Sequence, residues 1–275
     1  MLTLGIDIGS AASKVVILRN GQEILSKALH RAGIGSGGPE LVLQQALGKA
    51  GCRLDDIHAI IATGYGRNML SSADGRVSEL SCHARGAAFL APGIRTLIDV
   101  GGQDAKVIRL DARGRMQDFI MNDKCAAGTG RFMEVMAHVL NCDIATLSDL
   151  ATGENVVSIS STCTVFAETE VISRLAAGAS RSSIAAGVNL SISKRVAGLA
   201  LRCGIVPKVM MSGGVAQNAS LVAALSRELK ADILVRKECQ YCGALGAAVL
   251  AWEKARAGEL SGCGHSKGRI GESCE

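Results

Sequence analysis

The chain contains an internal repeat, which restricts its fold more than any other feature of the sequence. Residues 7–18, DIGSAASKVVIL, align without a gap on residues 99–110, DVGGQDAKVIRL. Each copy is an apolar run that ends in Asp, then a turn of small residues and a second apolar run. This pattern predicts a strand, a tight turn and a strand. The alignment pairs Asp7 with Asp99, Gly9 with Gly101, and Lys14 with Lys106.

Both predicted hairpins are suited to hold phosphate. No helix follows either turn directly, which excludes the Walker A loop and the Rossmann fingerprint, because both need a helix that opens at the phosphate. Glycine and serine let backbone N–H groups approach phosphate oxygens closely. A polar turn without a ligand is the alternative for one copy alone, and the duplication favours two turns that clamp one nucleotide. The residues predicted to line the phosphates are Gly9, Ser10, Ala11, Ala12, Ser13, Lys14, Gly101 and Gly102.

The polar residues of the two turns have predicted catalytic roles. Asp7 and Asp99 are expected to hold Mg²⁺, directly or through water, and to position water for hydrolysis. Gln103 or Asp104 is expected to orient the attacking water. The two repeat lysines have two interpretations, since a strand lysine either contacts phosphate or points to solvent.

A third segment, residues 206–229, reads as a strand, a Gly-Gly turn and a helix. Gly213 and Gly214 would bring backbone against a flat ligand, and Gln217 and Asn218 at the helix start could reach it with polar side chains. In this order, the three segments resemble the phosphate-1, phosphate-2 and adenosine motifs of the superfamily of acetate kinase, sugar kinases and actin. The resemblance implies ATP as ligand. It also implies an α/β fold of two duplicated lobes, each a mixed sheet flanked by helices, with ATP in the cleft.

Two of the ten cysteines stand where a helix is predicted to begin. Cys125 lies in residues 121–140 and Cys163 in residues 158–178, and apolar residues at helical spacing follow each of them. The N-terminus of a helix lowers a thiol pKa and stabilises an anion such as a thiolate-bound iron–sulfur cluster. A [4Fe–4S] cluster needs four thiolates, which a twofold homodimer would supply. Partly buried cap thiols and a redox or nucleophilic cysteine are the alternatives.

Several strings resemble one family more closely: LGIDIGSAASK, ATGYGRN, ELSCHARGA, IDVGGQDAKVI, MNDKCAAGTGRF, STCTVFAETEVIS, SGGVAQN and QYCGALGAA. They look like the activator components of 2-hydroxyacyl-CoA dehydratases, in the BadF-type ATPase family, which includes ATPase subunits of benzoyl-CoA reductase. The resemblance runs from about residue 2 to about residue 255. It implies a homodimer that bridges one oxygen-sensitive [4Fe–4S] cluster through Cys125 and Cys163. It also implies ATP-driven transfer of one electron from ferredoxin or flavodoxin to a dehydratase or reductase, including double-cubane-cluster proteins.

Composition and patterning exclude other classes of function. The net charge is +5 and aromatic residues make up 3% of the chain, which gives no basis for a nucleic-acid surface. No charged leader segment and no long apolar run is present, so we expect a soluble, cytoplasmic protein without a membrane partner. The rival functions are a small-molecule kinase of the same fold, for which no acceptor base is found, and an ATP-gated regulatory module.

We predict an N-terminal lobe of residues 1–91 and a C-terminal lobe of residues 92–256, with the last helix, 243–255, packed near the junction. The tail, 257–275, lacks apolar periodicity and is predicted to be disordered. The remaining cysteines and histidines with a possible ligand role are interpreted as structural or solvated: His83, His138, Cys239, Cys242, Cys263, His265 and Cys274.

Overall fold

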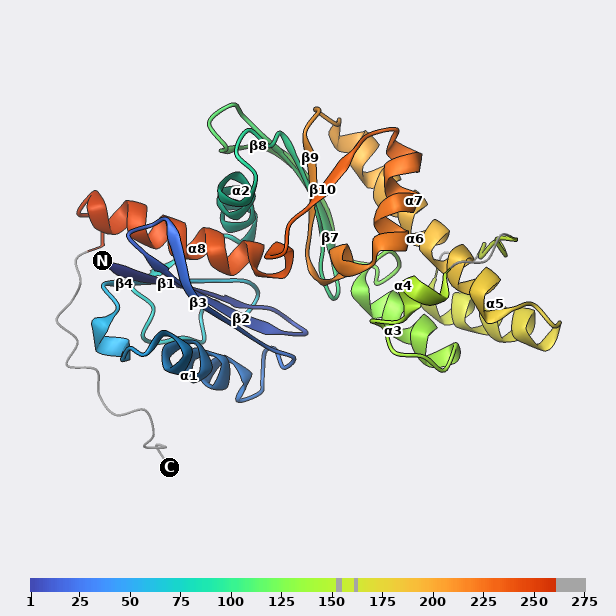
Figure 1. Cartoon of the computed structure of the whole chain (residues 1–275), viewed down its shortest axis with the longest axis horizontal. Helices are drawn as coiled ribbons and strands as arrows, with labels where there is room; N and C mark the ends of the chain where they lie inside the picture. The colour runs from blue at the N-terminus through green and yellow to red at the C-terminus, as the bar shows by residue number, and fades with distance from the viewer. Residues whose placement is uncertain (152–154, 161–162, 261–275) are drawn as a thin grey trace. The chain divides into compact units, whose positions relative to one another are not determined.

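The computed structural model of the chain describes residues 1–151, 155–160 and 163–260. Two compact units are present (Figure 1): the first is Met1–Gly86 together with the described residues from Gly243 to Leu260, and the second is Ala87–Cys242. The sequence placed a boundary near Pro92 and grouped the last helix with the second lobe. The contacts of that helix place it in the first unit instead.

The first unit contains a five-stranded mixed sheet of order β3-β2-β1-β4-β5. Strands β1, β2 and β3 pair antiparallel, whereas β4 and β5 run parallel to β1. The strands are β1 (Leu2–Ile8), β2 (Ser13–Arg19), β3 (Glu23–His30), β4 (Ala59–Thr63) and β5 (Gly75–Arg76). The helices are α1 (Gly38–Ala50), a short 3₁₀ turn η1 (Leu54–Asp56), α2 (Glu79–Leu90) and α8 (Cys242–Arg256).

Helices cover both faces of this sheet. Helix α1 begins with Pro39 in its first turn, ends at Gly51 in the left-handed conformation, and packs Val42 and Ala46 on the sheet. On the other face, Ala247 of α8 packs with Ile61 and Cys82. Helix α8 lies so close to β1 that a Cβ atom at Gly5 would collide with the helix backbone. The alanine- and glycine-rich sequence of α8 therefore permits this close packing.

The second unit repeats the topology of the first, with a five-stranded sheet of order β10-β9-β6-β7-β8. Again three strands pair antiparallel and two run parallel to the first of them. The strands are β6 (Thr96–Val100), β7 (Ala105–Leu110), β8 (Met116–Asn122), β9 (Val209–Ser212) and β10 (Ile233–Val235). Asp7 pairs with Lys14 across β1 and β2, and Asp99 pairs with Lys106 across β6 and β7. The predicted pair of hairpins is therefore confirmed in its register.

Helices of the second unit pack mainly on one face of its sheet. They are α3 (Gly130–Val139), α4 (Leu147–Leu150), α5 (Thr164–Ala176), α6 (Arg181–Cys203), α7 (Ala219–Leu229) and the 3₁₀ turns η2 (Gly214–Gln217) and η3 (Cys239–Tyr241). By length and composition alone α6 could cross a membrane, but 61% of its most apolar window is buried inside the protein. It is the central core helix of this unit, with Ile184, Val188 and Ile192 fully buried.

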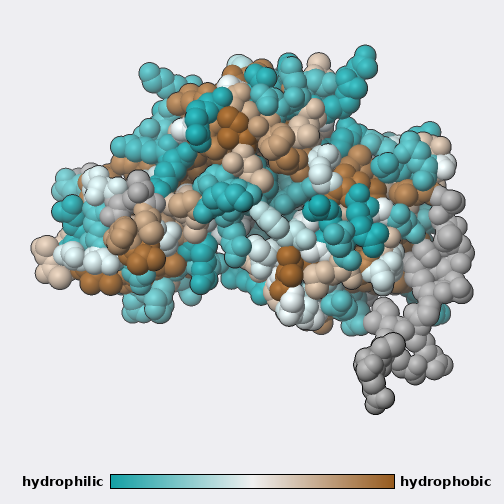
Figure 2. All heavy atoms as spheres, turned by 180° about the vertical axis from the view of Figure 1, so that it is seen from behind, coloured by the Kyte–Doolittle hydropathy of each residue, from teal (hydrophilic) through white to brown (hydrophobic). Residues whose placement is uncertain are grey.

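Not all apolar side chains of the second unit are covered. Helix α5 exposes 65% of Val165, 69% of Phe166 and 52% of Ile172. Figure 2 shows brown hydrophobic patches that interrupt the mainly hydrophilic surface, including one in the region of α5. Large exposed apolar side chains that gather on one helix are common where proteins contact other molecules.

Candidate nucleotide and metal-cluster sites

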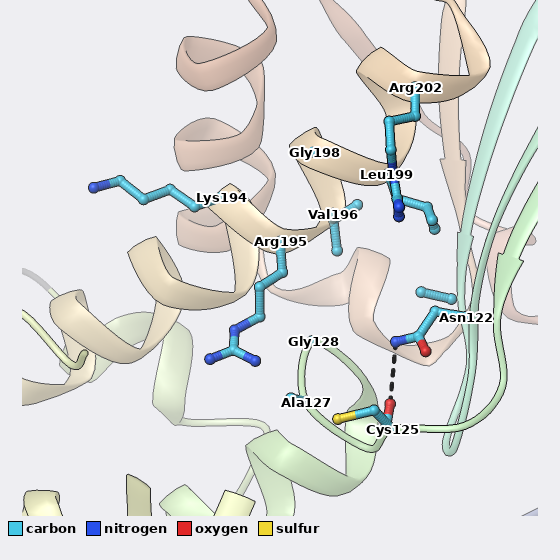
Figure 3. Close-up of a pocket in the computed structure, with 11 residues that line it drawn as sticks. Asn122, Cys125, Ala127, Gly128, Lys194, Arg195, Val196, Gly198, Leu199 and Arg202 are labelled. Atoms are coloured by element: carbon cyan, nitrogen blue, oxygen red, sulfur yellow. Dashed lines mark hydrogen bonds between the residues drawn. The ribbon is translucent and has the colours of Figure 1, made fainter. Parts of the chain in front are cut away.

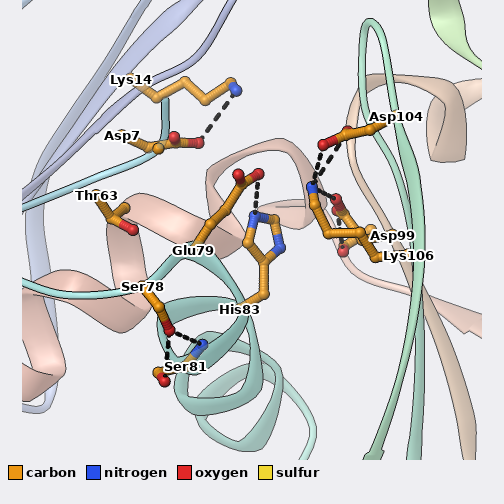
Figure 4. A network of polar contacts seen from close by, with 12 residues as sticks. Asp7, Lys14, Thr63, Ser78, Glu79, Ser81, His83, Asp99, Asp104 and Lys106 are labelled. Carbon is orange, nitrogen blue, oxygen red and sulfur yellow. Dashed lines mark hydrogen bonds and ion pairs between the residues drawn. The ribbon is translucent and has the colours of Figure 1, made fainter. Parts of the chain in front are cut away.

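The first hairpin presents a buried carboxylate beside a tight turn. The turn is closed by a hydrogen bond from the Gly9 N–H to the Ala12 carbonyl oxygen at 3.0 Å. Asp7 is only 4% exposed, and its Oδ2 forms an ion pair with Lys14 Nζ at 3.3 Å (Figure 4). Its other oxygen, Oδ1, is buried and has no hydrogen-bond partner among the described residues. A buried carboxylate oxygen without a partner is costly, so Asp7 is well suited to hold a hydrated cation.

The second hairpin has the same turn but a different carboxylate environment. The Gly101 N–H donates to the Asp104 carbonyl oxygen at 2.9 Å, as Gly9 does to Ala12. Asp99 accepts from Ser212 Oγ through Oδ1 at 2.6 Å and from Lys106 Nζ through Oδ2 at 3.2 Å. Each side-chain oxygen of Asp99 therefore already accepts a hydrogen bond. The two repeat aspartates are equivalent in the sequence alignment, but their carboxylate oxygens differ in hydrogen-bond partners.

Lys106 is buried in an ion-pair network. Its side chain is 1% exposed, and its ammonium group pairs with Asp99 at 3.2 Å and with Asp104 at 3.1 Å (Figure 4). The interpretation of Lys106 as a solvent-facing strand lysine is therefore wrong. A charge in this position is stable only because two carboxylates compensate it. Lys14, with 21% of its side chain exposed, forms an ion pair with Asp7 and keeps contact with solvent.

The two residues predicted to orient water lie in different environments. Asp104 is 4% exposed and is committed to Lys106, whereas Gln103 is exposed at the tip of the turn. Gln103 can therefore reach a ligand without breaking an ion pair. The role of either residue in hydrolysis stays a prediction.

The structure extends the repeat to a segment that the sequence analysis did not align. Thr63 in β4 pairs with Asp7, as Ser212 in β9 pairs with Asp99. A glycine with positive φ follows each hydroxyl residue, Gly64 at 84° and Gly213 at 87°. A Thr-Gly and a Ser-Gly dipeptide, each after an apolar strand, are the signal that could have identified this second half of the repeat.

In the predicted adenosine segment some residues are exposed, and others form hydrogen bonds within the protein. Gly214 and Gln217 are exposed, and the Gly213 N–H donates to the Cys239 carbonyl oxygen at 3.2 Å. Asn218 is the N-cap of α7, where Oδ1 accepts from the Leu221 N–H at 2.9 Å. Its Nδ2 donates to Asn189 Oδ1 at 3.2 Å. Gly214 and Gln217 remain available to a ligand, whereas the side chain of Asn218 serves the helix.

A histidine and a glutamate in α2 lie near Asp7 within the first unit. His83 is 5% exposed, and its Nε2 lies 3.7 Å from Glu79 Oε1 (Figure 4). A Cβ atom on Gly243 would lie 2.9 Å from His83 Nε2 and 3.1 Å from Asp7 Oδ2. The sequence does not predict this neighbourhood of His83, because nothing in the spacing of residues in α2 points to β1.

The two candidate cluster cysteines are both exposed, in different local structures. Cys163 is the N-cap of α5, as predicted. Cys125 does not stand at a helix start, because α3 begins only at Gly130 with Thr129 as its N-cap. An extra turn delays that helix: Gly128 has a φ of 87°, and the Thr129 N–H donates to the Ala126 carbonyl oxygen. The prediction of a helix-start cysteine is therefore correct for Cys163 and wrong for Cys125.

Backbone hydrogen bonds connect the second hairpin to the helix that follows the Cys125 loop. The Gly130 N–H donates to the Gly101 carbonyl oxygen at 2.9 Å, and the Arg131 N–H donates to the Gly102 carbonyl oxygen at 2.8 Å. A Cβ atom at Gly130 would lie 3.1 Å from the Gly101 carbonyl oxygen, so only a small residue permits this approach. The predicted phosphate turn and the start of α3 are one hydrogen-bonded structure.

The Cys239–Cys242 pair has the properties of structural thiols. Both residues are buried, and burial raises the pKa of the Cys239 thiol to about 11. Such a thiol carries almost no thiolate at neutral pH and is a weak nucleophile and metal ligand. Cys263, His265 and Cys274, together with most of the predicted disordered tail, lie outside the described residues.

Two sheets of equal topology, each with an Asp-bearing hairpin, define a protein of the actin-like, acetate and sugar kinase superfold. The chain belongs to the BadF/BadG/BcrA/BcrD ATPase family, whose model matches residues 4–251. This membership confirms the family that the sequence strings indicated.

Similar proteins agree with this membership. The 2-hydroxyisocaproyl-CoA dehydratase activator of Clostridioides difficile is 51% identical over 257 residues, which cover 93% of this chain and 97% of that protein. The (R)-2-hydroxyglutaryl-CoA dehydratase activating ATPase of Acidaminococcus fermentans is 51% identical over 255 residues, 92% of this chain and 98% of that protein.

Solved structures confirm the fold. The structure of the activator of the 2-hydroxyisocaproyl-CoA dehydratase from Clostridium difficile with bound ADPNP matches with a TM-score of 0.92 at 50% sequence identity. The match covers 94% of this chain and 97% of the activator chain. A ROK family glucokinase from Streptomyces griseus has a TM-score of 0.59 at 15% identity, covers 92% of this chain and 100% of its own, and shows the fold alone.

Proposed function

We propose that this chain is an ATP-hydrolysing activator that passes single electrons to a partner iron–sulfur enzyme, a 2-hydroxyacyl-CoA dehydratase or a related reductase. The observation that carries the proposal is the pair of backbone hydrogen bonds between Gly101–Gly102 and Gly130–Arg131. Because these bonds join the phosphate turn to the end of the Cys125 loop, a change at the nucleotide has a short covalent and hydrogen-bonded route to Cys125. The names of the similar activators support the choice of partner.

The nucleotide would be ATP with Mg²⁺, held by the backbone of the two hairpin turns. Asp7 fits the cation, since its Oδ1 is buried and has no hydrogen-bond partner in the described part of the chain. Lys14 remains a candidate for phosphate contact, because it is half-buried and its ammonium lies 3.3 Å from Asp7. Asp7 would hold the Mg²⁺ ion through its hydration shell, the ion would supply neutralisation of phosphate charge, and Gln103 would orient the attacking water.

In this proposal Cys125 and Cys163 would supply half of the ligands of a [4Fe–4S] cluster. Both thiols are exposed, and Cys163 caps a helix of 13 residues, whose N-terminus favours an anionic ligand sphere. A second copy of the chain related by a twofold axis would supply the other two thiolates. The apolar surface of α5, formed by Val165, Phe166 and Ile172, directly follows Cys163 and would be buried between the copies. The cluster would store one electron at low potential.

The residues of the chain couple the two sites in this proposal. Loss of the terminal phosphate changes the hydrogen bonds at the Gly101–Gly102 turn, and Gly130 and Arg131 follow because their N–H groups are bonded to that turn. The adjacent Cys125 loop then moves relative to Cys163. A ferredoxin or flavodoxin is the proposed donor, and the cytoplasm is the expected compartment, where such donors work.

Iron analysis tests the proposal directly. Wild-type protein purified without oxygen is compared with Cys125→Ser, Cys163→Ser and, as a matched control from the same unit, Cys142→Ser. We expect about four irons and four acid-labile sulfides per two chains in the wild type and in the control, and a loss in both test variants. Mass in solution is measured in parallel, with Phe166→Ser expected to weaken the dimer. Iron-free wild-type protein that still hydrolyses ATP would refute the electron-transfer function and favour a kinase or a regulatory module.

A further inference from the structure

A pocket of about 410 Å³ lies beside Cys125 in the second unit (Figure 3). One wall is the outer surface of α6 from Lys194 to Arg202, and the other is formed by Asn122 at the end of β8 and by the loop from Cys125 to Gly128. Asn122 Nδ2 donates to the Cys125 carbonyl oxygen at 3.2 Å and so fixes the loop to the strand. We call this hollow the Cys125 pocket. Neither the predicted phosphate turns nor the adenosine segment contributes to its lining.

The charged residues that line the Cys125 pocket are all cations, namely Lys194, Arg195 and Arg202. In Figure 3 the side chains of Arg195 and Arg202 extend from α6 toward the loop and strand wall, whereas Lys194 extends away. Arg195 is also held over the ring of Phe132, with 5.8 Å between its guanidinium carbon and the ring centroid. A lining with three cationic side chains and no acidic one favours an anionic occupant over a neutral one.

The α6 wall of the pocket leaves space for a side chain at one position. Gly198 is exposed, and a Cβ atom added there would meet no heavy atom within 4 Å. Arg195 and Arg202 are seven residues apart on the same face of α6, with Gly198 between them. A side chain at position 198 would therefore extend into open space beside Arg195 and Arg202.

We infer that the Cys125 pocket receives acidic side chains from the protein that donates electrons to this chain. The inference rests on the proposed function, and it adds where the donor binds and by which chemistry. The volume accommodates a few carboxylate side chains of a protruding loop, and the positive lining selects an acidic surface over a neutral one. An occupant of the pocket would contact Cys125, the proposed cluster ligand. One electron leaves the donor and enters the metal site at Cys125, and no covalent bond forms or breaks in the pocket.

Two substitutions at independent positions test the docking site. Arg202→Glu reverses a charge of the lining, and Gly198→Glu places a carboxylate in the open space without a steric conflict. Arg227→Glu, at an exposed position of α7 outside the lining, is the matched control for net charge. None of the three residues belongs to the nucleotide turns, so the basal ATPase rate should equal that of the wild type, which verifies folding.

The primary measurement is the affinity of the intact protein for an acidic, oxidised ferredoxin and, in a second arm, for an oxidised flavodoxin, by titration calorimetry. We expect Arg202→Glu and Gly198→Glu to weaken binding about tenfold or more at low salt, and Arg227→Glu to leave it near the wild-type value. The difference should shrink as salt rises from about 0.05 to about 0.5 M, because the interaction is screened. Reduction by dithionite, which needs no docking site, should proceed at the wild-type rate in all variants.

The binding assay does not require electron transfer, so it distinguishes failure of the proposed function from failure of the docking site. Iron-free protein that still binds acidic donors in this pocket would overturn the proposed function and keep the docking site. Donor binding that is unchanged in both pocket variants, or reduced equally by Arg227→Glu, would overturn the docking site and leave the proposed function intact. A change in dimer mass caused by both pocket variants would also overturn it, because the pocket would then serve the contact between copies.

Discussion

The repeat offers a comparison of two equivalent lysines within one protein. Lys106→Met removes an ammonium group that forms ion pairs with both Asp99 and Asp104. The side chain of Lys106 is only 1% exposed. Lys14→Met removes the equivalent group from the first hairpin, where the lysine side chain is 21% exposed and forms an ion pair with Asp7. Methionine keeps most of the side-chain volume, so that each substitution mainly removes the charge.

The expected losses of stability differ by several-fold. Removing one partner of a buried ion pair costs about 3–5 kcal/mol, because the remaining charge is left without compensation. An ion pair in contact with solvent contributes about 0–1 kcal/mol. Since 1 kcal/mol shifts the Tm of a domain of this size by roughly 2–4 °C, Lys106→Met should lower the Tm by roughly 6–20 °C. Lys14→Met should lower it by roughly 4 °C or less.

Differential scanning calorimetry and urea unfolding followed by circular dichroism measure these losses. Lys106→Met/Asp104→Asn should recover part of the stability, because it removes one of the two uncompensated carboxylates. Equal losses for Lys106→Met and Lys14→Met would refute the reasoning, since the two hairpins would then be energetically equivalent despite their different burial. So would a double variant that is less stable than Lys106→Met alone.

Three further predictions follow from the second unit. Gly213→Ala should cost roughly 2 kcal/mol or more in urea unfolding, because position 213 has a φ of 87° and a Cβ atom there would collide with the Val100 carbonyl; an unchanged midpoint would contradict this. Asn218→Ala should cost about 1 kcal/mol and Asn218→Ser less, as expected for an N-cap of α7, and equal losses would exclude capping as the cause. Native Cys239 should resist iodoacetamide at pH 8 while Cys125 reacts, as read by peptide mass spectrometry, and rapid labelling of Cys239 would contradict its burial. Because the pKa of folded Cys239 is raised to about 11, its contribution to stability is complete below the ordinary thiol pKa and is lost as pH rises toward 11.

The hairpins could be predicted from sequence because their signal is local. Each consists of two apolar runs around a short turn, and the gapless alignment of residues 7–18 on 99–110 fixes the register of both. The helix of residues 243–255 was equally visible from its composition, and α8 matches it to within one residue at each end. Its assignment to a unit was not local, because it depends on contacts with Ile61 and Cys82 far away in the sequence.

The chemistry of the second hairpin could not be predicted from the repeat alone. Lys14 and Lys106 are aligned, yet the burial of Lys106 depends on Asp104, which replaces an alanine of the first copy, and on Asp99. The hydroxyl bonded to Asp99 comes from Ser212, 113 residues further along the chain. Cys125 was misplaced for a different reason: the apolar spacing located α3, but Gly128 and the turn from Ala126 to Thr129 delay its start.

The division of the chain into units also has a consequence for its synthesis. Residues 87–242 are continuous, whereas the first unit is split and is completed only by α8. At about 5–20 residues per second, the ribosome needs roughly 10–30 s between the end of the first segment and the start of α8. During that interval the sheet face that α8 later covers, around Gly5 and Ile61, stays open to other apolar surfaces. The nascent first unit should therefore depend on chaperones until translation has passed Arg256, while the second unit can fold without waiting.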